Sequence, residues 1–551
     1  MLRFWILVVT AAAVAGAPSA GARFLSERLE MCRLADRNDD GCIDRRELRD
    51  FLKMFGAIHT RDDDKDEDEF LAARIVAILQ RVQPDAGGAY ASCATLFHYE
   101  DAISDEKNVE QFHLALTGDP SERRLTFAAL GHRPIQGDED NAAKAELECT
   151  LSDGRNFSAQ AYTYTVPSRW WQPHGWVGSL YNVTFTQLQA GQTYGYSCLG
   201  SAIGTFHVPA LPQASSTSSS VSTIFPTRFA TFGDMGTFMP LGFDVFRALE
   251  RSHASVPFDF VIHQGDISYA GIDTAVPALN ISSDDELEYI WDLFGRQIEP
   301  LAKIIPWMVG VGNHEAWYNF SAFRARYPMP SEASGGEDNF WYSFDYAGVH
   351  VVSASSEHDL SDGSAQLEWI ARDLRAANRN RRAVPWILFA IHRPLYSSDA
   401  DEYPEHSPGS FRLRQLEDLL LENNVDLTVT GHQHAYERCH PARNGTVLSW
   451  PHSRWNAATA EYEDVYNSPG APVHLMVGSA GAFQHEKWIN PSPIWSGKRF
   501  NQSEHADDLS GYIDGYGFVR VTLWNETHLS ATFESVNGES SSFADTFWVT
   551  K

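Results

Sequence analysis

The chain has 551 residues, of which 43% are hydrophobic and 12% aromatic, so it can bury more than one core, and a disordered chain is excluded. Its 72 acidic and 43 basic residues give a formal net charge of −29 at pH 7. Because this charge repels phosphate backbones and leaves no basic stripe, we expect no nucleic-acid partner.

The N-terminus predicts a secretory signal peptide over residues 1–22. Arg3 precedes an apolar run over residues 4–15, and small residues follow as far as Ala20 and Ala22. A short buried helix is the alternative. No apolar segment near the C-terminus is long enough for a membrane span, and the oligomeric state is not predicted.

Two further features favour a secreted or lumenal protein. The six cysteines are even in number and form no CxxC pair, which favours disulfides over a zinc site. The chain also carries seven predicted N-glycosylation sites, namely Asn156, Asn182, Asn280, Asn319, Asn444, Asn501 and Asn525.

Residues 23–108 predict a small helical region that contains an EF-hand-like calcium loop over residues 36–47. Gly41 stands at the sixth position, where the loop turns sharply, and Glu47 closes the loop at the twelfth. A solvated acidic loop is the alternative. Residues 84–97 resemble a partner loop without carboxylates, which should not bind metal. The predicted calcium ligands are Asp36, Asn38, Asp40, Cys42 and Glu47.

Residues 109–213 change to short alternating stretches separated by turn residues, a pattern typical of a β-sandwich. Cys149 and Cys198 fall within it, and the sequence leaves their pairing open. Residues 214–224, rich in serine and threonine, predict a domain linker.

Residues 225–551 alternate strand-like with helix-like segments and predict an α/β domain. The strand candidates are residues 228–232, 258–263, 307–311, 384–391, 425–430 and 473–477. The helix candidates are residues 285–301, 365–377 and 412–421.

Each of the first five strand candidates runs into a short motif of potential metal ligands. Loops at the carboxyl ends of strands form the binding crevice of open α/β sheets, so we expect these side chains to meet there. Carboxylate, phenolate, amide and imidazole groups without thiolates suit iron, zinc or manganese. Any one of these residues alone is better explained by a turn or by core packing, whereas the set indicates a metal site. The candidate ligands are Asp234, Asp266, Tyr269, Asn313, His392, His432 and His434.

The motifs resemble those of the purple acid phosphatases within the calcineurin-like metallophosphoesterases. Most of that superfamily has a histidine two places after the first aspartate, where this chain has Gly236, and Tyr269 is available as the replacement ligand. The resemblance covers the sandwich and the α/β domain but not the EF-hand-like region. It implies a multidomain protein with a fibronectin-III-like β-sandwich before an α/β metallophosphoesterase sandwich domain.

The resemblance also implies a dinuclear site. A ferric ion is expected at Asp234, Tyr269 and His434, and a divalent iron, zinc or manganese ion at Asn313, His392 and His432. Asp266 is expected to bridge both ions. A metal-bound hydroxide then attacks the phosphorus of a small phosphate monoester.

Substrate contacts are expected from Asn313, from His314, which would orient the phosphate and protonate the leaving alkoxide, and from His406. Plant members carry two adjacent histidines where this chain has none, and His406 is the nearest substitute. Hydrolysis should be fastest in mild acid. The alternatives are a phosphodiesterase or nucleotide pyrophosphatase on the same site, or a calcium-binding secreted protein that has lost catalysis.

Overall fold

The computed structural model describes residues 42–44, 90–92, 109–130, 147–169, 175–176, 178–210, 224–237, 240–273, 275, 282–400, 403–458, 461–482, 488–500, 515–537 and 540–551. The predicted signal peptide, most of the predicted calcium loop and nearly all of the predicted linker lie outside these residues. Within the described part of the chain, no helix is long and apolar enough to cross a membrane.

Two short strands are described in the predicted EF-hand-like region, β1 (Cys42–Asp44) and β2 (Tyr90–Ser92). They pair antiparallel, with Ile43 opposite Ala91. Ile43 is fully buried and belongs to the same hydrophobic cluster as the α/β domain. The helices predicted for this region lie outside the described residues, so its helical character stays a prediction.

A β-rich domain follows, as the sequence predicted. Its sheet has the strand order β3-β4-β7-β6-β5-β8-β9, and β6 pairs with β5 along its first half and with β7 along its second. All seven strands contribute to one core, and Cys149 forms a disulfide with Cys198. The strands are β3 (Glu110–Ala115), β4 (Arg123–Leu130), β5 (Leu147–Leu151), β6 (Asn156–Tyr162), β7 (Gly178–Phe185), β8 (Thr193–Cys198) and β9 (Ser201–His207).

The C-terminal part of the chain is an α/β domain with two large sheets. Its described residues also include a two-stranded sheet of β18 (Ala442–Arg443) and β19 (Thr446–Val447). The eight-stranded sheet contains, in spatial order, β12 (Trp307–Gly310), β11 (Phe260–Gln264), β10 (Thr227–Phe232), β24 (Gly517–Leu523), β25 (His528–Asn537), β26 (Ser540–Thr550), β21 (Glu461–Asn467) and β20 (His452–Asn456). The seven-stranded sheet contains β13 (Tyr342–Tyr346), β14 (Val349–Ser353), β15 (Trp386–Ala390), β16 (Leu427–Thr430), β22 (Val473–Val477), β17 (Tyr436–Cys439) and β23 (Ser496–Arg499). Strands β10, β11 and β12 run parallel, as do β14, β15, β16 and β22.

Almost every residue is buried in six of these strands, namely β10, β11, β12, β15, β16 and β22. This burial explains why the strands appear as continuous apolar runs in the sequence. The six predicted strands and three predicted helices are confirmed within a few residues. The longer helices are α6 (Pro240–Ser255), α7 (Glu288–Ala302), α10 (Ala365–Arg379) and α12 (Phe411–Glu422). The shorter ones are α8 (Ser321–Arg326), α9 (Ser331–Ser334), α11 (Tyr403–His406), η4 (Asn313–Glu315) and η5 (Trp317–Phe320).

Serine side chains cap the N-termini of two of these helices. The Ser364 hydroxyl accepts a hydrogen bond from Leu367 N at the start of α10, and the Ser410 hydroxyl accepts one from Leu413 N at the start of α12.

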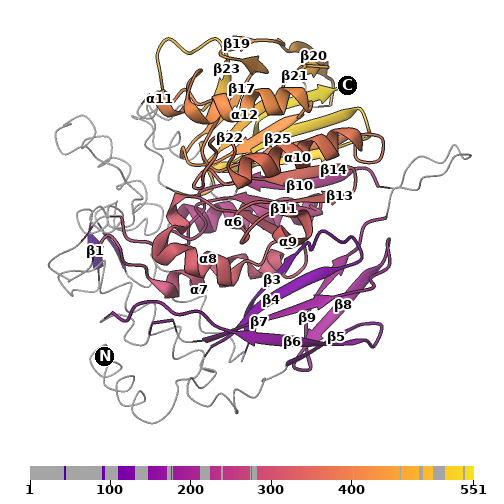
Figure 1. Cartoon of the computed structure of the whole chain (residues 1–551), viewed down its shortest axis with the longest axis vertical. Helices are drawn as coiled ribbons and strands as arrows, with labels where there is room; N and C mark the ends of the chain where they lie inside the picture. The colour runs from indigo at the N-terminus through magenta and orange to yellow at the C-terminus, as the bar shows by residue number, and fades with distance from the viewer. Residues whose placement is uncertain are drawn as a thin grey trace, which may run out of the picture.

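Figure 1 shows α7 on the side of the α/β domain that faces the β-rich domain. The Gln111 backbone N–H in β3 donates to Glu299 Oε2 in α7 at 2.8 Å. The two domains therefore meet through directed polar contacts.

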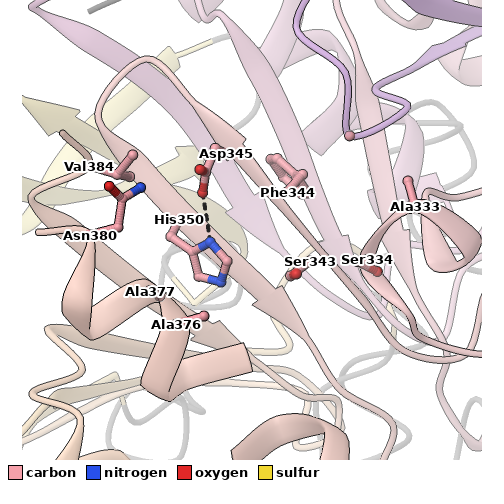
Figure 2. A pocket seen from close by; sticks show the side chains of 11 residues that line it. Ala333, Ser334, Ser343, Phe344, Asp345, His350, Ala376, Ala377, Asn380 and Val384 are labelled. Atoms are coloured by element: carbon pink, nitrogen blue, oxygen red, sulfur yellow. Dashed lines mark hydrogen bonds and ion pairs between the residues drawn. The ribbon is translucent and has the colours of Figure 1, made fainter. Parts of the chain in front are cut away.

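A cavity of about 260 Å³ lies beside β13, β14 and α10 (Figure 2). His350 points into it and is held by Asp345 and Asp373, at 2.7 Å and 2.8 Å from its two ring nitrogens. None of the predicted metal ligands lines this cavity. The cavity is therefore separate from the candidate metal site.

Candidate metal centre

The predicted metal ligands follow strands from both sheets of the α/β domain. The loops after β10, β11 and β12 come from the eight-stranded sheet, and those after β15 and β16 come from the seven-stranded sheet. The strand motifs alone suggested the crevice of an open sheet. The structure forms the site where the carboxyl ends of two packed sheets meet, which agrees with the sandwich domain implied by the resemblance. Two sheets allow ligands to converge from opposite sides.

The first group of side chains consists of Asp234, Asp266 and His434, whose ligand atoms lie within 4.8 Å of one another. Tyr269 completes it, because its hydroxyl lies 3.2 Å from Asp234 Oδ1 and 3.0 Å from His434 Nε2. All four side chains are buried. This is a compact set of two carboxylates, a phenol and an imidazole.

The second group consists of Asp266, His392 and His432 and meets the same distance criterion. Asn313 joins it, since its Oδ1 lies 3.1 Å from His392 Nε2. His392 Nε2 is also 3.3 Å from Asp266 Oδ1. The structure therefore brings all seven candidate ligands together, with Asp266 common to both groups.

The backbone is strained where it presents these ligands. Non-glycine residues with positive φ cost energy and persist where their surroundings require them. Glycines keep the loops close: a Cβ on Gly431 would lie 2.4 Å from Asp234 Oδ2, and one on Gly312 would lie 2.3 Å from Asp266 Oδ1. The ligand residues with positive φ are Asp234 (63°), Asp266 (50°), Tyr269 (56°) and His432 (71°).

The electrostatics of the cluster favour bound cations. Burial raises the pKa of Asp234 well above its usual range, and burial together with the charges of Asp234 and Asp266 does the same to the pKa of Tyr269. Burial also opposes ionisation of Asp266, but the charges of His392 and His314 outweigh it and hold the pKa of Asp266 well below its usual range. Metal ions would supply the positive charge that lets all three acids ionise, and the oxygen and imidazole donors suit iron, zinc or manganese.

Two residues that support the candidate ligands were not predicted from the sequence. Glu315 accepts hydrogen bonds from the backbone N–H groups of Asp266 and Ile267, both at 2.8 Å, and of Gly312, at 2.7 Å. The backbone carbonyl oxygen of Gln264 lies 3.0 Å from His392 Nδ1. Such partners orient ligands and fix imidazole tautomers. Glu315 directly follows Asn313-His314, so its place in that motif was an available signal.

His314 lies at the edge of the first group and not among the clustered ligand atoms. Its Nε2 is 3.9 Å from Asp266 Oδ2 and 3.7 Å from Asp273 Oδ2, and its buried Nδ1 has no hydrogen-bond partner among the residues that the structure describes. Its ring stacks on Trp317, with centroids 5.6 Å apart. These contacts fix the ring beside the site while leaving a nitrogen available.

His406 and Arg393 lie beside the second group. His406 is fully buried in α11, its Nδ1 is 3.0 Å from the Pro394 carbonyl oxygen, and its ring centroid lies 5.9 Å from that of His432. Arg393 Nη1 lies 3.0 Å from His432 Nε2. His406 was a substrate-binding candidate from the sequence, whereas Arg393 had no predicted role, although it directly follows the candidate ligand His392.

The predicted glycosylation sites differ in exposure. Asn156, Asn319 and Asn444 are exposed, whereas Asn182 and Asn525 are half-buried. Asn280 and Asn501 lie outside the described residues. The candidate calcium ligands also lie outside them, apart from Cys42 in β1.

Comparisons with known proteins agree with this geometry. Residues 227–436 match the family model of calcineurin-like phosphoesterases, and residues 471–546 match that of the iron/zinc purple acid phosphatase-like protein C. Acid phosphatase type 7 from Mus musculus is 32% identical over 68% of this chain and 77% of its own length. Purple acid phosphatase 18 from Arabidopsis thaliana is 27% identical over 80% of this chain and 84% of its own length.

Among solved structures, a purple acid phosphatase from yellow lupin seeds superposes with a TM-score of 0.61 at 22% identity. The superposition covers 81% of this chain and 75% of the lupin chain, and at this identity it supports the fold alone. The sequence matches extend across the α/β domain and include all the strand-end motifs. The chain therefore belongs to the purple acid phosphatase family of calcineurin-like metallophosphoesterases and is a phosphatase.

Proposed function

We propose that this protein is a secreted acid phosphatase that hydrolyses phosphate monoesters at a dinuclear site of one ferric and one divalent ion. The observation that carries the proposal is the position of Asp266, which belongs to both ligand groups. A carboxylate shared by two groups is what a bridging ligand requires. The names of the acid phosphatase relatives support the substrate class.

In this proposal, the ferric ion binds to Asp234, Tyr269 and His434. Asn313, His392 and His432 would hold a divalent iron, zinc or manganese ion, and Asp266 would serve as a ligand common to both ions. When bound, the two ions would activate a water molecule for attack and offset negative charge on the phosphoryl group.

The protein groups around the ions then position the substrate and handle its proton. His314 holds the phosphoryl group from the side of Asp266 and passes a proton to the leaving oxygen. Its packing against Trp317 and Tyr269, with ring centroids 5.6 Å and 4.4 Å away, supports this role by restricting the ring. His406 contacts the substrate from the side of His432, and its bond to the Pro394 carbonyl oxygen sets its orientation.

The test compares hydrolysis of p-nitrophenyl phosphate and of bis-p-nitrophenyl phosphate by protein whose metals have been measured by elemental analysis. We expect one iron and one divalent ion per chain, and faster hydrolysis of the monoester. Faster hydrolysis of the diester would favour a phosphodiesterase or nucleotide pyrophosphatase. Absence of hydrolysis at full metal loading would favour a binding protein that has lost catalysis.

We also propose a secretory location, with cleavage after the predicted signal over residues 1–22. The exposure of Asn156, Asn319 and Asn444 supports glycosylation at these sequons, and the Cys149–Cys198 disulfide fits an oxidising compartment. Protein collected from the medium of expressing cells should lose mass on treatment with an N-glycosidase. Retention of unglycosylated protein inside the cells would contradict the secretory location.

A second proposed function is calcium binding by residues 36–47, within an EF-hand-like region over residues 23–108. The strand pair supports it, because Ile43 is the eighth residue of this loop and Ala91 lies in the expected partner loop without carboxylates. Glu47→Gln removes the closing bidentate carboxylate and should weaken calcium binding roughly ten-fold or more. Calorimetry with calcium measures this, and unchanged affinity would contradict it.

The remaining domain boundaries follow the same proposal. A fibronectin-III-like β-sandwich spans residues 109–213, a linker spans 214–224, and the catalytic domain spans 225–551. The common core of strands β3 to β9 supports the sandwich. Limited proteolysis should cut within residues 214–224 and release these two parts.

A further inference from the structure

An open groove of about 780 Å³ lies between the β-rich domain and the α/β domain. Its volume falls within the range of about 300–1,000 Å³ that small-molecule sites occupy. The wall from the β-rich domain is formed by three residues at and after the end of β6, namely Tyr162, Tyr164 and Thr165. The opposite wall includes three residues of α8, namely Ser321, Arg324 and Ala325. The two walls touch where the Tyr162 hydroxyl donates to the Ala325 carbonyl oxygen at 2.8 Å.

One predicted glycosylation site borders this groove. Ser321, which lines the groove, is also the third residue of the sequon that begins at Asn319. Two residues of chain span at most about 7 Å, so a sugar attached to Asn319 begins beside the groove. The sequons that begin at Asn156 and Asn444 contribute no lining residue to it.

The local backbone presents Asn319 to solvent while it anchors the next residue. Tyr318, Asn319 and Phe320 all have positive φ, at 49°, 58° and 59°. The Phe320 ring packs against Phe340 and His358, with ring centroids 5.0 Å and 5.1 Å away. Asn319 itself is exposed. The turn is therefore fixed from inside by Phe320, and Asn319 stays available for modification.

The lining of the groove suits an uncharged carbohydrate. Tyr162 and Tyr164 are half-buried and combine an aromatic ring with a polar hydroxyl, which matches a sugar with its apolar C–H faces and its hydroxyl groups. Ionised carboxylates accept hydrogen bonds from such hydroxyl groups. Because three acids outnumber one arginine, the lining disfavours anionic ligands. The charged lining residues are Arg324, Glu332, Glu337 and Asp338.

We propose that an N-glycan attached to Asn319 lies in this groove and joins the two domains through contacts with both walls. This inference rests on the proposed secretory location and is independent of the phosphatase reaction. In the attachment step, Asn319 Nδ2 loses a proton and bonds to the anomeric carbon of the sugar, and the lipid diphosphate of the oligosaccharide donor leaves. Because the glycan is tethered beside the groove, its effective concentration there is high, and weak contacts are enough to hold it.

The first experiment measures how fast an N-glycosidase releases each glycan from the native protein, with mass spectrometry to identify the sites. The glycan on Asn319 should be released at least about ten-fold more slowly than the glycan on Asn444, as expected if it is docked for about nine-tenths of the time. Asn444 is the matched control, because it is also exposed and has a positive φ of 46°. After denaturation both glycans should be released at the same rate.

A second experiment fills the groove with a side chain. Thr165 lies in the wall from the β-rich domain and is exposed, so Thr165→Trp places an indole ring in the space that the glycan would take. In this variant the release from Asn319 should become as fast as the release from Asn444.

A third experiment removes the glycan and measures the stability of the protein. Asn319→Gln should lower the thermal unfolding midpoint by roughly 2–4 °C, the size expected for the loss of a modest contact in a large domain. Asn444→Gln should change the midpoint much less. Both asparagines have positive φ, so the backbone strain of the new side chain is similar at the two positions.

Equal release rates at Asn319 and Asn444 would overturn the docking, and so would an Asn319 glycan that stays protected in Thr165→Trp. A midpoint that falls equally in Asn319→Gln and Asn444→Gln would show that the glycan does not join the domains. An unmodified Asn319 in protein that is glycosylated at Asn444 would overturn this inference alone. Absence of glycans from every sequon would contradict the secretory location as well.

Discussion

The Glu315 carboxylate accepts a hydrogen bond of 2.8 Å from the backbone N–H of Asp266, a residue 49 positions earlier in the chain. The same carboxylate accepts from Ile267 and Gly312. Glu315 thereby ties the loop after β11 to the loop after β12. The position of the ligand shared by both groups depends on this buried acid, which touches no ligand side chain in these contacts.

Glu315→Gln tests this dependence. The amide keeps one acceptor oxygen but turns an NH₂ donor toward backbone N–H groups, which leaves buried donors unpaired at a cost of about 1–3 kcal/mol. We expect metal affinity or activity to fall about 10–100-fold, as for other partners of metal ligands. Elemental analysis after dialysis measures the change. Glu332→Gln, on the exposed side of α9, is the control, and equal behaviour of both variants would contradict the assignment.

His314→Ala should leave the metal content near normal and reduce turnover by roughly a hundred-fold, the usual contribution of a positioned acid. The reason is that His314 belongs to neither of the two ligand groups, while its ring is fixed by Trp317. Steady-state kinetics and metal analysis on the same sample provide the measurement. A variant that lost an ion would show His314 to be a ligand.

Tyr269→Phe should abolish visible absorption, because a phenolate bound to ferric iron absorbs visible light and the benzene ring of phenylalanine does not bind iron. Asp266→Asn should lose metal, colour and activity together, since Asp266 belongs to both groups and Tyr269 to one. Tyr269→Phe should keep measurable activity. Absorption spectra with metal analysis distinguish the two, and a colourless wild type that is active with two zinc ions would disprove the iron assignment.

His350→Gln should alter the pH dependence of stability. Burial lowers the pKa of His350, but Asp345 and Asp373 outweigh it and raise the pKa from 6.5 to about 9. Because the folded state binds the proton more tightly, the stabilisation is fully present below pH 6.5 and is lost as the pH rises through about 9. The contribution should be about 1–3 kcal/mol.

Denaturant unfolding at pH 6 and pH 10 measures this contribution. The variant should be less stable than wild type at pH 6, and the difference should shrink at pH 10. A difference that is the same at both values would show that His350 is not charged between its two aspartates. Since no predicted metal ligand lines this cavity, metal content should not change.

Much of the fold could be predicted from the sequence because its signals are local. Strands such as β22 (Val473–Val477) are buried on both faces and appear as continuous apolar runs, so their bounds were predicted closely. The helix α10 begins after Ser364, whose side chain accepts from Leu367 N, and serine in this position marks a helix start in any sequence. The strand pattern alone did not show the division into two sheets, because strand partners far apart in the chain leave no local pattern. The sandwich domain was implied only by the family resemblance.

The sequence by itself determined the candidate ligands, since each of them follows a strand within a few residues and its chemistry is visible in its motif. Only the tertiary structure decided that Glu315 holds Asp266 in place and that Arg393 lies beside His432. Glu357 lies 36 residues before Arg393, and their pairing at 3.0 Å exists only because β14 and β15 are neighbours in the sheet. Motifs specify which donors and acceptors are present, whereas hydrogen bonds depend on distances of about 3 Å that packing alone sets.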